Sequence, residues 1–494
     1  MKLTRERRAG LEAVAAVLAA ATLTACATMG SITKGTADSP AHSWAPPAGK
    51  NPAPSAALAP VVPAELQAPG RAWTLDEIVD IGLANNPQSR AAWNAARVAS
   101  AAATAALGAY LPEIDANVTA AKQKAVFAGG QFIVDQTTLT PAATLRLLLF
   151  DFGGREASVR AARRALEAAN WTHNSVLQTV LLRIESAYYQ YLTAKALLEA
   201  QEVTRKGAEA NHEAAQVRHQ AGVATVADVL QAKTGLSAID LEIVATRGLI
   251  QTLHGALASA MGLPAATPFE VSEKLPDAID FACVDEQIEL CIQDALAKRP
   301  DLAAARAQAR EAEEGVRKAR STFFPTLSLS GDIGRIYYKG RPNSNPFYAI
   351  SVSLGLPFLF GFQEYAVLAA KAQAEAARDE ATGLGREVEL QVWTSYYGLK
   401  TAEQEIATAR DLLASAQASY DVALGRYKEG VGSILDLLSA QSLLENGRVE
   451  NVRARSDWFQ ALVQFAHDTG ALEPGALPAS PGRSQGPGKG DRRP

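Results

Sequence analysis

The sequence repeats itself, and the length of the repeat constrains the fold more than any other feature. The stretch Arg218–Ala232 reads RHQAGVATVADVLQA, and Arg426–Ala440 reads RYKEGVGSILDLLSA. The same offset of about 210 residues relates Ser186–Tyr189 to Thr394–Tyr397. Solenoid repeats have periods of only about 20–50 residues, so this offset indicates two duplicated halves of one structure.

The first 25 residues have the organisation of a secretory signal peptide. Met1–Arg8 is basic, and Leu11–Thr24 is apolar but too short to span a membrane. The segment Leu23–Cys26 reads LTAC, which resembles the bacterial lipobox, where the cysteine is acylated and becomes the first mature residue. We therefore expect Cys26 to carry a lipid anchor, and Ala27 after it favours the outer membrane. An ordinary signal cut beside the cysteine is the alternative.

Two segments do not predict packed structure. Residues 26–71 form a linker rich in Pro, Ala, Gly and Ser, and residues 474–494 form a similar tail, so we expect both to be extended or disordered. Whether Cys283 and Cys291 form a disulfide stays open, because a helix beginning near Gln287 leaves the required geometry doubtful. The net charge of −4 and the absence of a basic stripe exclude a nucleic-acid binder.

Each half predicts the same order of elements. A short helix over Leu75–Asn86 follows Thr74, a favourable N-cap residue. Pro87 opens a second helix that Pro112 ends, and Pro300 and Pro325 bracket its counterpart.

After each of these prolines the apolar period changes to two, which predicts β-hairpins at about 112–150 and about 325–358. The first hairpin segment is about five residues longer than the second, so we expect a longer loop there. Strands of about 10–14 residues suit a membrane, where about 9–11 residues suffice. A soluble sandwich is the alternative, but four strands make a poor sandwich and cannot close a barrel. We therefore expect partner strands from other chains.

Each hairpin is followed by a helix of unusual length. The segments from Gly154 to about Ala221 and from Gly361 to about Glu429 contain no proline and few glycines. About 68 helical residues extend about 100 Å. Each helix reverses at Gly222 or Gly430 into a shorter helix. Such lengths are typical of coiled coils or fibrous assemblies.

No catalytic or metal-binding pattern is present in the sequence. The histidines are scattered, and His212-Glu213 begins a zincin-like motif that lacks its second histidine. The chain has only three methionines, so a methionine path for copper is not supported. We expect no enzyme activity, no cofactor and no metal site.

The duplication, the amphipathic hairpins and the paired long helices together resemble the TolC family of outer-membrane efflux channels. The most specific motif is R-[YH]-x-x-G-V-x-[ST]-x-x-D-[LV]-L-x-A, which occurs once in each half. The resemblance implies an α+β membrane protein with a two-repeat TolC-like fold and four transmembrane strands per chain. Three chains would form a 12-stranded barrel continued by a long α-helical barrel. The repeats would span 72–270, with a tip near 222, and 284–473, with a tip near 430.

The resemblance also implies functional positions. The helix-turn-helix tips would dock a periplasmic adaptor protein through six matching residues: Arg218, Gly222, Val223, Arg426, Gly430 and Val431. Asp436 matches one of two acidic rings that close the pore in this family, and Asp228 is its counterpart in the first repeat. Ser439 occupies the position of the second ring, which puts the gate in question. A favourable helix dipole is the alternative explanation for both aspartates.

We therefore expect a lipid-anchored homotrimer in the outer membrane of a Gram-negative bacterium, extending into the periplasm. It would act as a passive exit duct for drugs or other toxic small molecules, opened by an adaptor and an inner-membrane pump of the resistance-nodulation-division type. The alternatives are a duct for metal ions or secreted protein, and a structural periplasmic stalk that would not need the four amphipathic strands.

Overall fold

The computed structural model describes residues 36–37, 39–44, 71–127, 132–272, 274–276, 287–358 and 361–472. Internal packing divides the chain into two compact units. The strand unit includes Asn94–Asn170 and Ala304–Thr382, and the hairpin unit includes Asp38–Trp93, Trp171–Ala303 and Gly383–Pro494. Within the described ranges, no helix combines the length and the apolar character needed to cross a membrane.

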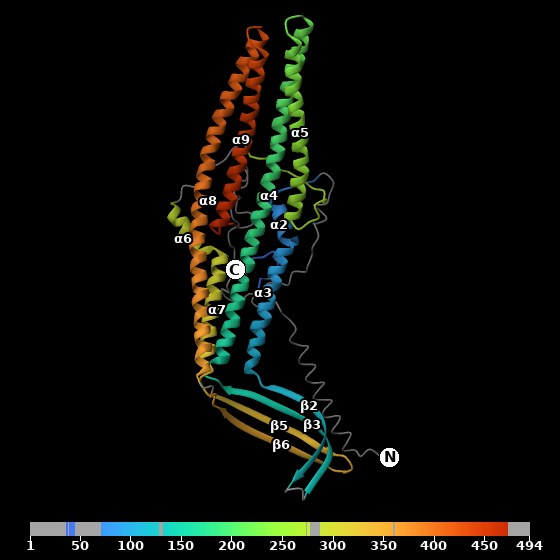
Figure 1. Ribbon diagram of the computed structural model, residues 1–494, viewed down its shortest axis with the longest axis vertical. Coiled ribbons are helices and arrows are strands. Elements are labelled where there is room, and N and C mark those ends of the chain that lie inside the picture. Colours follow the sequence, from blue (N-terminus) through green and yellow to red (C-terminus); the bar gives the residue numbers. More distant parts are fainter. Residues whose placement is uncertain are drawn as a thin grey trace, which may run out of the picture. The chain divides into compact units, whose positions relative to one another are not determined.

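The main helices and strands occur in the same order twice (Figure 1). The first half contains α2 (Leu75–Asn85), α3 (Pro87–Ala106), β2 (Glu113–Phe127), β3 (Phe132–Phe150), α4 (Gly154–Gln220) and α5 (Val226–Ala260). The second half contains α6 (Ile288–Lys298), α7 (Pro300–Ser321), β5 (Thr326–Tyr338), β6 (Ser344–Gly355), α8 (Phe362–Lys428) and α9 (Ile434–Asp468). Both long helices, α4 and α8, have 67 residues, and both returning helices, α5 and α9, have 35. The duplication inferred from the sequence is therefore confirmed in the order and length of the elements.

Caps and prolines set the helix ends where the sequence predicts them. The Thr74 hydroxyl accepts a hydrogen bond from the Glu77 backbone N–H, and the Glu77 carboxylate accepts one from the Thr74 N–H, which makes a capping box at the start of α2. Pro87 and Pro300 are the first residues of α3 and α7, where a missing N–H leaves no helical hydrogen bond unmade.

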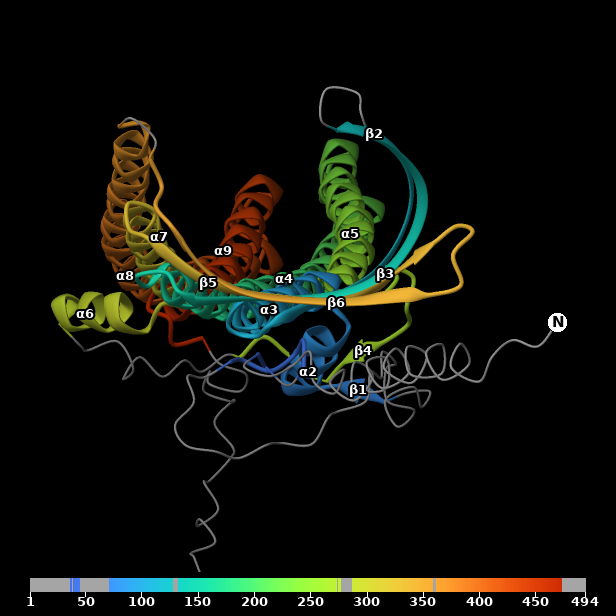
Figure 2. The same ribbon diagram turned by 90° about the horizontal axis from the view of Figure 1, so that it is seen from below.

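The four long strands form one antiparallel sheet in the order β2-β3-β5-β6, and Figure 2 shows its curvature. The two halves of the chain meet at its centre, where β3 pairs with β5. The prediction of a longer loop in the first half is wrong, because residues 128–131 connect β2 and β3 whereas 339–343 connect β5 and β6. The extra residues lengthen the strands instead: β2 and β3 have 15 and 19 residues, whereas β5 and β6 have 13 and 12. The pairing with β2 continues through Thr140 before Pro141 and through Ala142 after it.

The sheet has one polar and one apolar face. On the polar face Arg146 donates to Asp115 at 3.1 Å, and the Thr144 hydroxyl donates to Asp332 at 2.8 Å. Apolar side chains that are 46–81 % exposed cover the opposite face: Ile114, Val118, Leu139, Ile333, Tyr348, Ile350, Val352 and Leu354. The predicted alternation is therefore confirmed, and no described helix covers the apolar side chains on this list.

A short junction turns the chain from β3 into α4. Phe152 and Gly153 adopt left-handed backbone conformations, with φ of 51° and 89°. The Phe152 ring stacks on Phe324 at 4.9 Å, which ties this junction to the turn between α7 and β5. Gly361, the residue before α8, has a φ of 87°. Gly153 and Gly361 occupy the same position in the two repeats, and each turns the chain from a strand into a long helix.

The core of the hairpin unit is aromatic and aliphatic. The short strands β1 (Ala72–Trp73) and β4 (Glu270–Val271) pair in parallel, and Trp73 stacks on Phe269 at 5.0 Å. Tyr189 of α4 stacks on Phe459 of α9 at 4.7 Å, which joins the two repeats. The remaining interior consists largely of buried aliphatic side chains of α2, α4, α5, α8 and α9.

Part of the predicted linker is held against α4. The Trp44 backbone N–H donates to the Asn174 side-chain oxygen at 2.7 Å, and the Asn174 amide donates to the Trp44 carbonyl at the same distance. Trp44 also makes an edge-on contact with Trp171, with ring centroids 5.4 Å apart. Residues 39–44 thus differ from the expectation of an unpacked linker, whereas Cys26 and Cys283 lie outside the described residues. Cys291 is buried in α6.

Candidate functional site: the helical hairpin tips

The first tip begins with a defined helix stop. At the end of α4 the Val223 N–H donates to the Arg218 carbonyl at 2.9 Å, and the Gly222 N–H donates to the His219 carbonyl at 2.9 Å. Gly222 has a φ of 75°, in the left-handed region that favours glycine. These two hydrogen bonds and the left-handed glycine define a Schellman motif.

The second tip ends α8 in the same way. The Val431 N–H donates to the Arg426 carbonyl at 3.0 Å, and the Gly430 N–H donates to the Tyr427 carbonyl at 3.2 Å. Gly430 has a φ of 76°. The spacing Arg-x-x-x-Gly-Val is therefore the spacing of a helix stop, in which the arginine supplies the carbonyl, the glycine reverses the chain and the valine supplies the closing N–H.

Each returning helix begins with a capping box, and the aspartate of the motif completes it. In α5 the Asp228 carboxylate accepts from the Thr225 N–H at 2.8 Å, and the Thr225 hydroxyl accepts from the Asp228 N–H at 3.2 Å. In α9 the same pair of bonds joins Ser433 and Asp436, at 3.4 and 3.1 Å. The whole repeated motif thus encodes a helix stop followed by a helix start. Both aspartates have a structural role, and their role in a gate stays a prediction.

The two repeat-related arginines have different surroundings. Arg218 reaches from the first tip to the second: its Nη1 donates to the Tyr427 carbonyl at 3.0 Å, and its guanidinium carbon lies 4.8 Å from the centre of the Tyr427 ring. Tyr427 is only 5 % exposed, and burial raises the pKa of its phenol. Seven residues earlier on each helix, Asn211 donates to the Tyr420 hydroxyl at 3.4 Å. A row of polar contacts therefore holds the two hairpins together.

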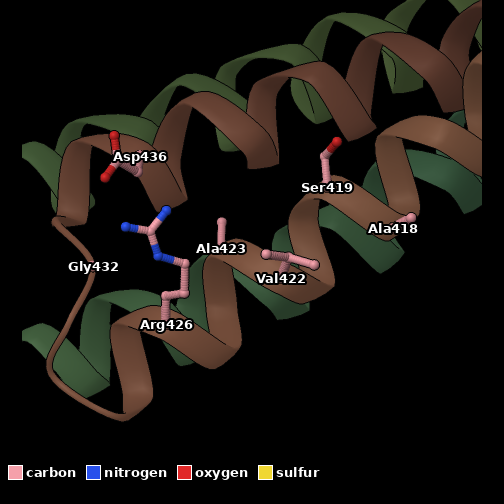
Figure 3. Close-up of a pocket in the computed structure, with 7 residues that line it drawn as sticks. All are labelled: Ala418, Ser419, Val422, Ala423, Arg426, Gly432 and Asp436. Carbon is pink, nitrogen blue, oxygen red and sulfur yellow. The ribbon is translucent and has the colours of Figure 1, made fainter.

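Arg426 lies on an open side of the second hairpin. It lines a shallow hollow of about 380 Å³, together with Ala418, Ser419, Val422, Ala423, Gly432 and Asp436 (Figure 3). The Arg426 guanidinium points across the hollow toward Asp436, and the other helix of the hairpin supplies that carboxylate. Asp436 and Ser439 are both exposed, one helical turn apart.

The tips also expose apolar side chains. Val223, Val226, Val431 and Leu435 lie on or beside the two turns, and more than half of each side chain is exposed. Arg218, Gly222 and Val223 form one tip, and Arg426, Gly430 and Val431 form the other, as the sequence predicts. The sequence reading missed Tyr427, the acceptor of Arg218, although the repeated Arg-[Tyr/His] pair was a signal for it.

Metal ligands are not gathered at the tips or elsewhere in the described chain. Among the described residues, no group of three or more His, Cys, Asp or Glu side chains is placed to hold a metal ion. The candidate site therefore consists of polar contacts, exposed apolar residues and charged groups.

Comparisons with known proteins agree with this arrangement. Residues 79–263 and 291–471 match the family described as outer membrane efflux protein. Protein CyaE of Bordetella pertussis is 29% identical over 385 residues, which cover 74% of this chain and 77% of that protein. Pyoverdine export outer membrane protein OpmQ of Pseudomonas aeruginosa is 26% identical over 407 residues, covering 79% and 83%. The solved structure of the outer-membrane channel OprN shares the fold, with a TM-score of 0.74 at 20% identity, over 81% of this chain and 90% of that one.

The two matched segments each cover one repeat and together cover most of the chain. They include both tips and all four strands of the long sheet. The chain therefore belongs to the outer membrane efflux protein family, whose members are outer-membrane channels of efflux systems.

Proposed function

We propose that three copies of this chain form the passive exit duct of a tripartite efflux system. The observation that carries the proposal is the four-stranded sheet, with its exposed apolar face and its two edge strands, β2 and β6. In a bilayer each edge must find a partner, because unpaired backbone groups cannot remain in hydrocarbon. Three copies would supply 12 strands, an even number of the kind that bacterial outer-membrane barrels prefer.

Adjacent residues on the edge strand β6 test this proposal. Val352 lies on the apolar face, where it is 63 % exposed, and Ser353 lies on the polar face. A lysine on the lipid side costs about 2–4 kcal/mol at mid-membrane, whereas a lysine on the lumen side is tolerated. Val352→Lys should therefore abolish insertion into preformed vesicles, and Ser353→Lys should insert normally. Equal behaviour of the two variants would favour the periplasmic stalk.

The tips are the surface we propose for the adaptor. Exposed Val223 and Val431 beside the two turns offer apolar contact area, and Arg218 and Arg426 define the ends of the helices. Val431→Asp should weaken chemical cross-linking to the purified adaptor while the trimer remains intact. Unchanged cross-linking would place the docking surface elsewhere. The energy source would be an inner-membrane pump of the resistance-nodulation-division type.

The cargo we propose is a small organic compound, as the pyoverdine export role named for OpmQ suggests. Accumulation of such compounds in a strain lacking this chain tests that cargo class against metal ions or secreted protein. We also propose that Cys26 carries the lipid anchor. Labelling with a radioactive fatty acid should be lost in Cys26→Ser, and persistent label in that variant would contradict the anchor.

A further inference from the structure

The hollow beside the second tip lies on a different side of α8 from the contacts within the chain. Tyr420 and Tyr427, seven residues apart, contact the first hairpin. Ser419 and Arg426 each precede one of these tyrosines, and they line the hollow. Successive residues of a helix are rotated by about 100°, so Ser419 and Arg426 form a second row that the first hairpin does not cover.

Through the repeat, Arg426 of this second row corresponds to Arg218, whose contact within the chain is observed. The offset between the halves relates Arg218 to Arg426 and His219 to Tyr427. Within the chain, Arg218 of the first repeat lies on Tyr427 of the second. The same contact with the repeats exchanged would join Arg426 of the second repeat to His219 of the first. Within one chain, the first hairpin already contacts the Tyr427 side of the second hairpin. The His219 that meets Arg426 must therefore come from another copy.

In a closed ring of copies, the neighbouring copy can supply this His219. Two-repeat chains arranged head to tail place the second hairpin of one copy against the first hairpin of the next. We propose that this contact is quasi-equivalent to the one within the chain, with the Arg426 guanidinium seated on the imidazole and backbone carbonyl of His219 of the partner subunit. This inference rests on the trimeric duct proposed above and names the contact that closes its hairpins.

The exposure of the four residues agrees with the proposal. Tyr427 is buried and Arg218 is half-buried, because the two residues contact each other within the chain. Arg426 and His219 are both exposed, and the His219 Nδ1 lies 3.0 Å from the Ala224 carbonyl, which holds the ring beside its own turn. Within the described part of the chain, neither Arg426 nor His219 makes a hydrogen bond or ring contact with the other hairpin, so these two residues are the pair that the ring would join.

The returning helices repeat the same relation. Within the chain, Gly235 of α5 faces Leu438 of α9, with a Cβ placed on the glycine 4.0 Å from the leucine side chain. The repeat offset converts this pair into Leu443 and Leu230. Both leucines are exposed, at 55 % and 61 %. A partner copy in the proposed position would cover both leucines. This would place an apolar contact beside the contact of Arg426 with His219 of the partner subunit.

Cysteine pairs at the two equivalent contacts provide the test. His219→Cys with Arg426→Cys forms the proposed contact between copies, and Arg218→Cys with Tyr427→Cys forms the observed contact within one chain. A short bis-maleimide reagent must span the same geometry in both pairs, and the unsubstituted chain measures the background of its own cysteines. The first pair should give covalent dimers and trimers on a denaturing gel. The second should stay at monomer mass, with its link found by peptide mass spectrometry.

Native mass spectrometry before cross-linking separates this inference from the proposed function. If the protein is trimeric and only the second pair reacts, the hairpins close by another contact and the inference is wrong. If the thiol of Arg426→Cys is cross-linked only to an added adaptor, the hollow belongs to that partner and the inference is also wrong. A protein that is monomeric in detergent and in vesicles would contradict the trimeric duct itself. The proposed contact between copies would then fail together with the duct.

Discussion

At the scale of single residues, the tip glycines Gly222 and Gly430 carry a left-handed backbone requirement. Gly222 has a φ of 75°, and an alanine there would cost about 1–2 kcal/mol in the left-handed region. Gly248 lies inside α5 with open space around it, so an alanine there should stabilise the helix by about 0.5–1 kcal/mol. Thermal melts should show a lower Tm for Gly222→Ala and a higher one for Gly248→Ala. Shifts in the same direction would contradict the helix-stop assignment.

Glu185 in α4 is a second residue with a measurable consequence. It is 3 % exposed, its Oε2 has no hydrogen-bond partner within the described chain, and burial raises the pKa of its carboxyl from 4.5 to about 7. Between these two values only the folded state holds the proton, so stability falls as the pH rises from 4.5 to 7.

Glu185→Gln removes this dependence while keeping the shape of the side chain. The variant should match the parent near pH 4.5 and exceed it by on the order of 3 kcal/mol above pH 7. Unfolding by denaturant at both pH values measures the difference. A variant that is less stable than the parent at pH 8 would show that the Glu185 carboxylate has a partner in the assembled duct.

At the scale of elements, the capping box of α9 and the proposed gate depend on the same residue. Asp436→Asn keeps an oxygen that can accept from the Ser433 N–H but removes the charge, whereas Ser433→Ala removes the cap and keeps the charge. Loss of the cap costs about 1 kcal/mol. If Asp436 closes the pore, Asp436→Asn should raise the open probability in a planar bilayer, and Ser433→Ala should leave it unchanged. Equal effects would assign Asp436 a structural role only.

The same scale shows what the sequence can predict. The ends of α2, α4 and α8 lie within one residue of the predicted positions, because prolines, capping residues and glycines act locally. The extent of β3 was not predicted, because Pro141 interrupts the apolar alternation without interrupting the pairing with β2. The Arg218–Tyr427 contact was also missed, because the repeated Arg-[Tyr/His] pair marks both positions but does not show that they meet across the two repeats. The packing of Trp44 on α4 lies in a stretch whose composition predicts a linker.

At the scale of the whole molecule, duplication explains why one chain is not sufficient. Each repeat supplies a β-hairpin and a helical hairpin, and the pairing of β3 with β5 joins the two β-hairpins. The contact of Arg218 with Tyr427 joins the two helical hairpins. In both places one junction is made within the chain, and the outer edges of the sheet and the outer sides of the helical hairpins are left for a partner copy. A ring of copies is the arrangement that closes both kinds of junction at once.

Single-channel conductance of the purified mature protein in a planar lipid bilayer tests the central claim most directly. The account predicts discrete conductance steps from a protein that native mass spectrometry shows to be trimeric, with Val352→Lys giving none because it does not insert. A trimer that is inserted in the bilayer and yet shows no conductance, even with the charge of Asp436 removed, would contradict a duct and leave a structural stalk.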